Sequence, residues 1–114
     1  MSALKTQIPT QSARMLKTRV LAADATITIT AEGRLSGAGI IRLMAELAEG
    51  LELCCGVVVL DVTACQCEGN AVVSVIHEAI VQAAPARCSV RVVTADVDVA
   101  IALDRAEIAR TMRS

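Results

Sequence analysis

The stretch that decides the fold lies at residues 57–73 and reads VVVLDVTACQCEGNAVV. Its first part, together with Gly56, is a valine-rich run over 56–62, which is typical of a strand buried on both faces. Its last part opens the segment 70–84, NAVVSVIHEAIVQAA, whose apolar residues recur at helical spacing. Asn70 is well placed to cap that helix, and Pro85 ends it. The stretch therefore predicts a buried strand, a short loop and a helix.

The remainder of the chain continues this alternation of strands and helices. Residues 16–21 predict an edge strand, and the alternating TITIT at 26–30 predicts a strand with one buried face. Residues 40–50 carry apolar side chains at helical spacing, and 88–93 predict another strand. Residues 96–112 predict a short helix followed by a terminal helix or strand. We therefore predict an α/β fold with a mixed, mostly parallel central sheet of four to five strands and helices packed on it.

Composition excludes several classes of function. The 114 residues suit one domain, and 54% of them are hydrophobic, but none is Phe, Tyr or Trp. Single-stranded nucleic acids bind mainly by stacking on aromatic side chains, so we expect no nucleic-acid partner. The net charge of −1 gives no sign of a polyanion-binding body.

The two ends of the chain differ in character. Residues 1–14 predict a flexible tail, and residues 15–114 form the predicted domain. No apolar run reaches the ~18 residues that a membrane-spanning helix needs, and no secretory signal is present. We therefore expect a cytoplasmic protein without direct membrane insertion.

The cysteines do not form a convincing metal site. Cys54 and Cys55 precede the buried strand, whereas Cys65 and Cys67 follow it. At ~3.3 Å per residue the strand separates the pairs by roughly 20 Å, too far for one zinc ion with bonds of ~2.3 Å. We expect neither a metal nor another cofactor. The Cys-x-Cys pair lacks the two-residue spacer of thioredoxin-like motifs, which leaves open whether these residues are small buried hydrophobes or redox-sensitive thiols.

The sequence contains no recognisable catalytic constellation. It has no nucleophile paired with a base, no paired carboxylates in one loop and no phosphate-binding G-x-x-x-x-G-K motif. The Gly-rich stretch after the strand 26–30 fits neither the dinucleotide-binding nor the phosphate-binding spacing. We therefore expect a protein that is not an enzyme.

Three segments within residues 20–112 resemble the STAS domain, the fold of bacterial anti-sigma-factor antagonists. The turn at 33–36, GRLS, occupies the position of a Gly-acidic-Leu-Asp turn. Residues 60–63, LDVT, match a strand end that reads Leu-Asp-Leu-Ser in the family, and 68–71, EGNA, stand where Asp-Ser-Ser-Gly opens a helix. The segment 97–112 is similar to the closing part of the family.

The resemblance implies a function in transcription regulation by partner switching. An anti-sigma-factor antagonist binds an anti-sigma factor that is also a kinase, and so releases a sigma factor. Phosphorylation of the second Ser of the loop separates the complex. Here Asn70, which has no hydroxyl, stands at the phosphoacceptor position, Gly69 replaces the neighbouring Ser, and Ser36 replaces the Asp of the first turn. The partner-binding or switch residues that the resemblance implies are Thr63, Cys65, Cys67, Glu68, Gly69, Asn70, Ala71, Arg34 and Ser36.

Two kinds of partner and three modes of control remain open at this point. The chain is either an antagonist that binds an anti-sigma factor or kinase, or a non-catalytic subunit of a membrane transporter complex that docks on its ATPase. It binds its partner constitutively, is switched by other chemistry such as the thiols of Cys65 and Cys67, or has become a structural subunit. The sequence does not predict an oligomeric state.

Overall fold

The computed structural model describes residues 16–54, 56–83 and 88–113. The predicted flexible tail at 1–14 and the predicted helix end at Pro85 lie outside these residues. The elements follow the predicted order of strands and helices, with a strand closing the chain. They are β1 (Lys17–Ala23), β2 (Thr26–Arg34), α2 (Ala38–Leu53), β3 (Val57–Gln66), α3 (Gly69–Ala83), β4 (Ser89–Thr94), α4 (Val97–Arg105) and β5 (Ala109–Met112).

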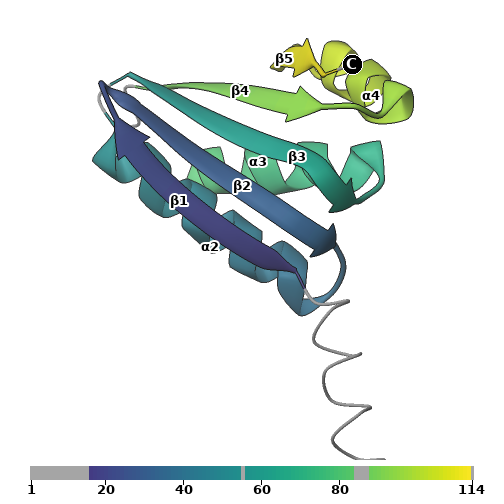
Figure 1. Cartoon of the computed structure of the whole chain (residues 1–114), viewed down its shortest axis with the longest axis horizontal. Coiled ribbons are helices and arrows are strands. Elements are labelled where there is room, and N and C mark those ends of the chain that lie inside the picture. Colours follow the sequence, from purple (N-terminus) through teal and green to yellow (C-terminus); the bar gives the residue numbers. More distant parts are fainter. Residues whose placement is uncertain (1–15, 55, 84–87, 114) are drawn as a thin grey trace, which may run out of the picture.

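The strands form one mixed sheet in the order β1-β2-β3-β4-β5 (Figure 1). β1 pairs antiparallel with β2 at one edge, and every other neighbouring pair is parallel. The antiparallel pair is joined by the two-residue turn Asp24–Ala25, whose φ angles of 50° and 60° are those of a hairpin turn that follows the twist of the strands. The predicted α/β fold with a mostly parallel sheet is therefore confirmed, as is the edge position of the first strand.

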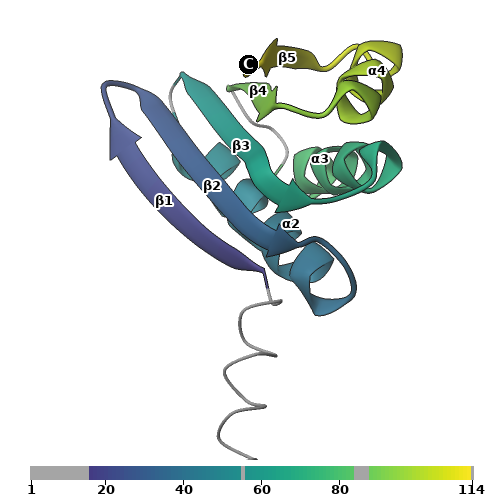
Figure 2. The ribbon, with the colours of Figure 1, turned by 45° about the vertical axis from the view of Figure 1, so that its right-hand side comes forward.

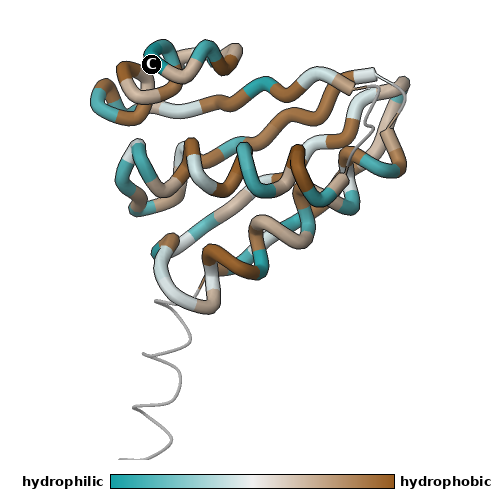
Figure 3. Tube along the Cα trace, turned by 180° about the vertical axis from the view of Figure 1, so that it is seen from behind, coloured by the Kyte–Doolittle hydropathy of each residue, from teal (hydrophilic) through white to brown (hydrophobic). Residues whose placement is uncertain are grey.

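α2 and α3 pack side by side on the same face of the sheet (Figure 2). The reason is topological: consecutive parallel strands that step in one direction across a sheet, each joined by a right-handed crossover, place their helices on one side. The hydrophobic segments of the strands lie behind these two helices (Figure 3). The largest fully buried side chains are Ile29, Leu43, Leu47, Leu51, Leu60, Ile76, Leu103, Val58, Val62, Val72, Val75 and Val92.

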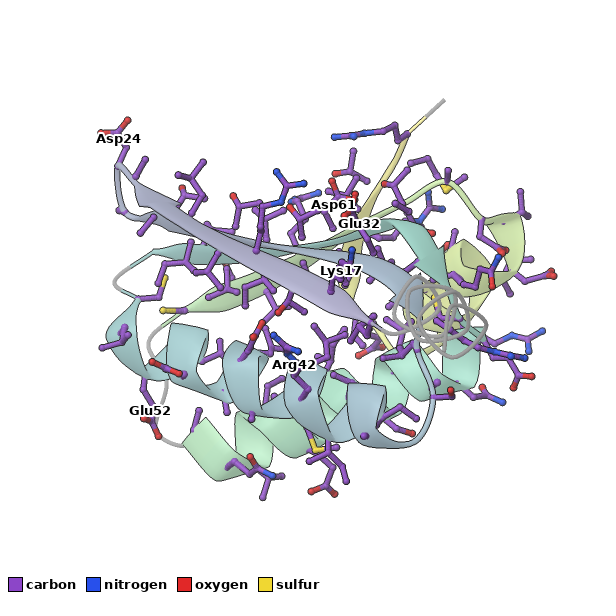
Figure 4. All side chains as sticks on the ribbon, turned by 60° about the horizontal axis from the view of Figure 1, so that its bottom comes forward. Lys17, Asp24, Glu32, Arg42, Glu52 and Asp61 are labelled. Atoms are coloured by element: carbon purple, nitrogen blue, oxygen red, sulfur yellow. The ribbon has the colours of Figure 1, made fainter. Side chains whose placement is uncertain are left out.

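The prediction that the valine-rich strand is buried on both faces is wrong. In β3 buried and half-buried residues alternate, with Val58 and Leu60 facing the helices and Val57 and Val59 facing the other side. No described helix packs on that second face, and Figure 4 shows Asp61 and Glu32 on the side of the sheet away from α2 and α3. β-Branched residues fill a half-covered strand as readily as a buried one, so the run of valines did not distinguish the two cases.

α4 lies at the far edge of the helix layer and packs on α3, next to β5 (Figures 1 and 2). It contributes Val99 and Leu103 to the core. None of the described helices is long and apolar enough to cross a membrane.

Candidate functional site

A β-bulge at the end of β3 decides which side chains reach the site. Thr30 of β2 is paired with Asp61 and Glu32 with Ala64, so β3 has one more residue than β2 in this interval. Before the bulge Val62 faces the helices, and after it Cys65 pairs with Gly33 on that same face. Without the extra residue the alternation would have turned Ala64 inward. The bulge therefore places the Cys65 and Cys67 side chains against the core on the helix side.

The helix after β3 begins two residues earlier than a cap at Asn70 implies. The carbonyl oxygen of Glu68 accepts hydrogen bonds from the backbone N–H groups of Ala71, at 3.1 Å, and Val72, at 3.2 Å. Glu68 thus holds the cap position, and α3 begins at Gly69. The prediction that Asn70 caps the helix is wrong: its exposed side chain lies in the first turn, at the positive end of the helix dipole.

The β3–α3 loop borders a first hollow on its β2–α2 side. This hollow, of about 490 Å³, brings together five of the predicted site residues with Ile40 of α2. It is lined by Arg34, Leu35, Ser36, Gly37, Ile40, Gln66, Cys67, Glu68 and Ala71. The turn that follows β2 is held against the loop by the N–H group of Leu35, which donates to the carbonyl oxygen of Gln66 at 3.0 Å.

A second hollow lies on the opposite side of the same loop, between the start of α3 and α4. It has a volume of about 590 Å³ and contains three predicted site residues. It is lined by Glu68, Gly69, Asn70, Val73, Asp98, Ile101, Ala102, Arg105 and Ala106. The α4 residues were not predicted as site residues, because nothing local in the sequence pairs a helix near residue 100 with the start of a helix at residue 69. Glu68 lines both hollows and separates them.

Gly69 is fixed by the close approach of α4. A Cβ atom at position 69 would lie 2.6 Å from the Cβ of Ala102 and 3.2 Å from the carbonyl oxygen of Asp98. Carbon atoms in contact are ordinarily separated by about 3.5–4.0 Å. The departure from the Ser of the family pattern at this position therefore has a steric reason in this chain.

α4 is anchored at both of its ends. Oδ1 of Asp96 accepts from the N–H groups of Asp98, at 2.8 Å, and Val99, at 3.3 Å, which caps the helix. Beyond its C-terminus, Arg110 of β5 forms a bidentate ion pair with Asp104, at 3.1 and 2.9 Å. This pair holds the pKa of the Asp104 carboxyl below its ordinary value. The wall of the second hollow is therefore held in place by its own polar contacts.

Thr63 lies in neither hollow. It belongs to β3 on the open face of the sheet, and its N–H group donates to Oδ1 of Asp61 at 2.9 Å. The hydroxyl oxygen of Thr63 is buried and has no hydrogen-bond partner among the described residues. Asp61 also lies 3.6 Å from Nη2 of Arg113. Thr63 therefore lies in the bulge, beside the two hollows, and lines neither of them.

The two thiols after the bulge interact with each other. Both are half-buried, and a hydrogen bond donated by Cys67 lowers the pKa of the Cys65 thiol. The pKa of the Cys67 thiol is raised, because Cys67 donates this hydrogen bond, is partly buried and lies near the negative charge of Asp96. Cys65 is therefore the sulfur at which a thiolate forms first.

The described residues contain no group of three or more His, Cys, Asp or Glu side chains capable of holding a metal ion. Cys54 lies at the other end of β3, where its sulfur accepts a hydrogen bond from the N–H group of Gly56 at 3.1 Å. The imidazole of His77 is exposed on α3, about two turns beyond the loop.

Comparison with known proteins identifies the fold. No protein-family model matches the chain, and no curated protein matches its sequence. Among solved structures the chain is similar to the crystal structure of an anti-sigma factor antagonist from Mycobacterium paratuberculosis, with a TM-score of 0.57 over 82% of this chain and 80% of that one. The fold is STAS-like. The identity of 13% limits the similarity to the fold, so partners and site chemistry have to be argued from this chain's own residues.

Proposed function

We propose that this STAS-like domain is a protein-binding regulatory module that docks a protein partner on the β3–α3 loop and its two hollows. The partner class is an anti-sigma factor of the kind that is also a kinase. The observation that carries the proposal is the position of the loop, which separates two hollows lined by three different helices. A partner that fills both hollows contacts the first turn of α3 on either side.

The chemistry of this surface suits a protein partner. The lining side chains Ile40, Val73 and Ile101 are apolar, and Arg34 and Arg105 are exposed cations near the margins of the two hollows. Protein interfaces combine an apolar centre with a polar rim in which Arg is enriched. Among the described residues no hydrogen bond joins a nucleophile to a base in either hollow, although Cys67 and Glu68 both line the first one, which favours binding over catalysis at this surface.

Asn70 sets the mode of control in this proposal. Its exposed side chain stands in the first turn of α3, where a phosphate group would meet the free N–H groups and the positive end of the helix dipole. An amide has no hydroxyl to phosphorylate, so phosphorylation at this position does not release the partner. A phosphate here would add about two negative charges to the centre of the docking surface.

The binding surface is tested by two matched substitutions. The parent, purified from its own cells under native conditions, identifies the partner by mass spectrometry, and affinities are then measured with purified proteins. Ile101→Glu, in the wall of the second hollow and 44% exposed, is expected to weaken binding by about 10-fold or more, as a charge placed in an apolar contact does. Leu53→Glu is the control, because this residue is 70% exposed at the last position of α2, about 20 Å along the helix from the first hollow.

Equal affinities for Ile101→Glu and Leu53→Glu contradict the proposed surface. Recovery of a transporter ATPase in place of an anti-sigma factor contradicts the proposed partner class and supports the transporter-subunit alternative.

The mode of control is tested by Asn70→Ser. A purified cognate kinase is expected to phosphorylate the variant and leave the parent unmodified, and the phosphorylated variant is expected to lose the partner. If the kinase modifies neither protein, the inherited phosphorylation chemistry is absent from this loop and not merely silenced.

A further inference from the structure

The loop has no hydroxyl group at positions 68–71, but two thiols stand directly before them. The fold brings these thiols together. Cys65 and Cys67 are two residues apart and therefore share a face, and the bulge makes this the face that packs against the core. The sulfur of Cys67 lies 3.9 Å from the carbonyl oxygen of Cys65, to which its S–H group donates. The strand partner of Cys65 is Gly33, which has no side chain to cover the sulfur. Both thiols are half-buried rather than sealed in the core.

We propose that Cys65 and Cys67 form a reversible disulfide when a hydroperoxide oxidises Cys65, and that this bond changes the conformation of the docking loop. The regulatory consequence rests on the proposed function, because it assumes that a protein partner docks on this loop. In this proposal a disulfide changes the start of α3 covalently, as phosphorylation of a serine does in antagonists that have one in this loop.

The oxidation proceeds in two steps. The Cys65 thiolate attacks one oxygen of the hydroperoxide, the O–O bond breaks, and a hydroxide (or alkoxide) leaves and takes up a proton, so that Cys65 becomes a sulfenic acid. Cys67 loses its proton to solvent, its sulfur attacks the sulfenic sulfur, the S–S bond forms, and the S–O bond breaks to release water. Two thiols lose two electrons and two protons, and the hydroperoxide is reduced. A dithiol in solution reverses the change by exchange.

The division of roles between the two sulfurs follows from their contacts. When Cys65 ionises, the S–H group of Cys67 turns from the carbonyl oxygen of Cys65 to its thiolate sulfur and stabilises the negative charge, so the pKa of Cys65 is lowered. The thiolate is the form that reacts with peroxides. Cys67, whose pKa is raised, keeps its proton until the sulfenic acid has formed and then acts as the resolving thiol. Reactive cysteines are commonly placed next to such a second thiol.

The geometry also makes the disulfide easy to reduce and lets it move the start of α3. Residues two apart on an extended strand have Cα atoms about 6.6 Å apart, near the upper end of the roughly 4.4–6.8 Å range of disulfides. Closing the bond therefore pulls Cys67 toward Cys65. Glu68, the next residue, carries the carbonyl oxygen that caps α3 and separates the two hollows, so it moves with Cys67. Strained disulfides are the more easily reduced ones, as reversible control requires.

The test uses the reduced full-length chain and hydrogen peroxide as the oxidant. Cleavage by chymotrypsin after Leu60 and by trypsin after Arg87 gives the fragment 61–87, whose only cysteines are Cys65 and Cys67, and mass spectrometry then reads this pair alone. We expect this fragment to lose two hydrogen atoms and to regain them with dithiothreitol. Cys67→Ser is expected to stop at the sulfenic acid, which dimedone traps, and Cys65→Ser is expected to form neither product. A bond from Cys65 to another cysteine, or direct oxidation of Cys65 to the sulfinic acid in the parent, overturns the inference.

A second readout addresses the loop. Amide hydrogen exchange at residues 69–73 is expected to rise several-fold on oxidation and to return on reduction, whereas unchanged exchange overturns the conformational half of the inference. With the purified partner, oxidation is expected to weaken binding about 10-fold or more in the parent but not in Cys67→Ser. Oxidised parent that binds as well as the reduced form overturns the regulatory half. Failure of the reduced protein to bind its partner through this loop contradicts the proposed function instead, and leaves the mass and exchange results to decide the thiol chemistry.

Discussion

The packing of α4 against the loop is tested most directly by Gly69→Ala. The added Cβ would lie 2.6 Å from the Cβ of Ala102, 3.2 Å from the carbonyl oxygen of Asp98 and 3.4 Å from the Cα of Val99. The first contact is about 1 Å too short for two carbon atoms, and two of the three neighbouring atoms belong to the backbone of α4. Relief therefore requires a displacement of α4 on the order of 1 Å, because no flexible side chain is available to rotate away.

The expected cost follows from two opposing terms. Overpacking of a well-packed site costs about 1–3 kcal/mol. Replacing glycine by alanine recovers about 0.4–1 kcal/mol, because the unfolded chain loses conformational freedom. We therefore expect Gly69→Ala to lower the free energy of unfolding by about 1–2 kcal/mol, with a Tm decrease of about 4–8 °C per kcal/mol for a domain of this size.

Chemical denaturation followed by circular dichroism measures this change, with Gly50→Ala as the matched control. Gly50 lies inside α2, where an added Cβ would meet its first neighbour, Cδ1 of Ile29, at an ordinary 3.4 Å. Alanine is preferred to glycine within helices, so the control is expected to raise the free energy of unfolding by about 0.5–1 kcal/mol. Replacing glycine by alanine is thus expected to lower the free energy of unfolding at position 69 and to raise it at position 50.

A double-mutant cycle attributes the effect to the α4 contact. Ala102→Gly alone costs about 1 kcal/mol through helix propensity, but in the Gly69→Ala background it removes the shortest contact. The combined variant is expected to be more stable than the sum of the single effects by about 1 kcal/mol. Strict additivity, or a Gly69→Ala variant as stable as the parent, would refute the close approach of α4 to the loop.

Three further changes have defined outcomes. Ala25→Gly is expected to stabilise the domain by about 0.5–1 kcal/mol, because alanine at a φ of 60° is strained and glycine is not; a loss of stability in thermal unfolding contradicts the assigned turn. Asp96→Ala removes the acceptor of two backbone N–H groups at the start of α4 and is expected to cost about 1 kcal/mol in denaturant unfolding; a change within experimental error shows that the cap contributes nothing. Cys67→Ala removes the hydrogen bond that lowers the pKa of Cys65 and leaves burial, which raises it, so the pH midpoint of Cys65 alkylation by iodoacetamide is expected to move upward. A midpoint that stays in place or falls contradicts the thiol pairing.

Much of the fold follows from local pattern. The alternation of Ile27 and Ile29 with half-buried threonines appears in β2 as the sequence predicted, and Ala31 continues it. Asp61 accepts a hydrogen bond from the N–H group of Thr63, two residues along the same strand, which is likewise a local contact. The helical spacing of apolar residues placed both major helices, because amphipathic periodicity has to match the face that is buried.

The site was predicted only in part. The resemblance led to Arg34, Ser36 and the segment 67–71, and the structure places these around the loop that borders both hollows. It did not lead to Ile101 or Arg105, whose positions depend on where a later helix packs. The assignment of Asn70 as the cap is wrong by two residues, because backbone hydrogen bonds decide which residue is the cap and the residue type only favours it.

The order of the elements, the composition of the core and the absence of a hydroxyl at residues 68–71 follow from the sequence, since they depend on residue type and local spacing. Only the tertiary structure shows that none of the described helices covers one face of the sheet, because this depends on the side to which the crossovers turn. Only the tertiary structure also shows that a bulge turns Cys65 and Cys67 inward. A bulge is a mismatch in the pairing of two strands, so the sequence of one strand alone does not predict it. The approach of α4 that excludes a side chain at Gly69 is likewise a contact between segments about 30 residues apart, for which no local pattern exists.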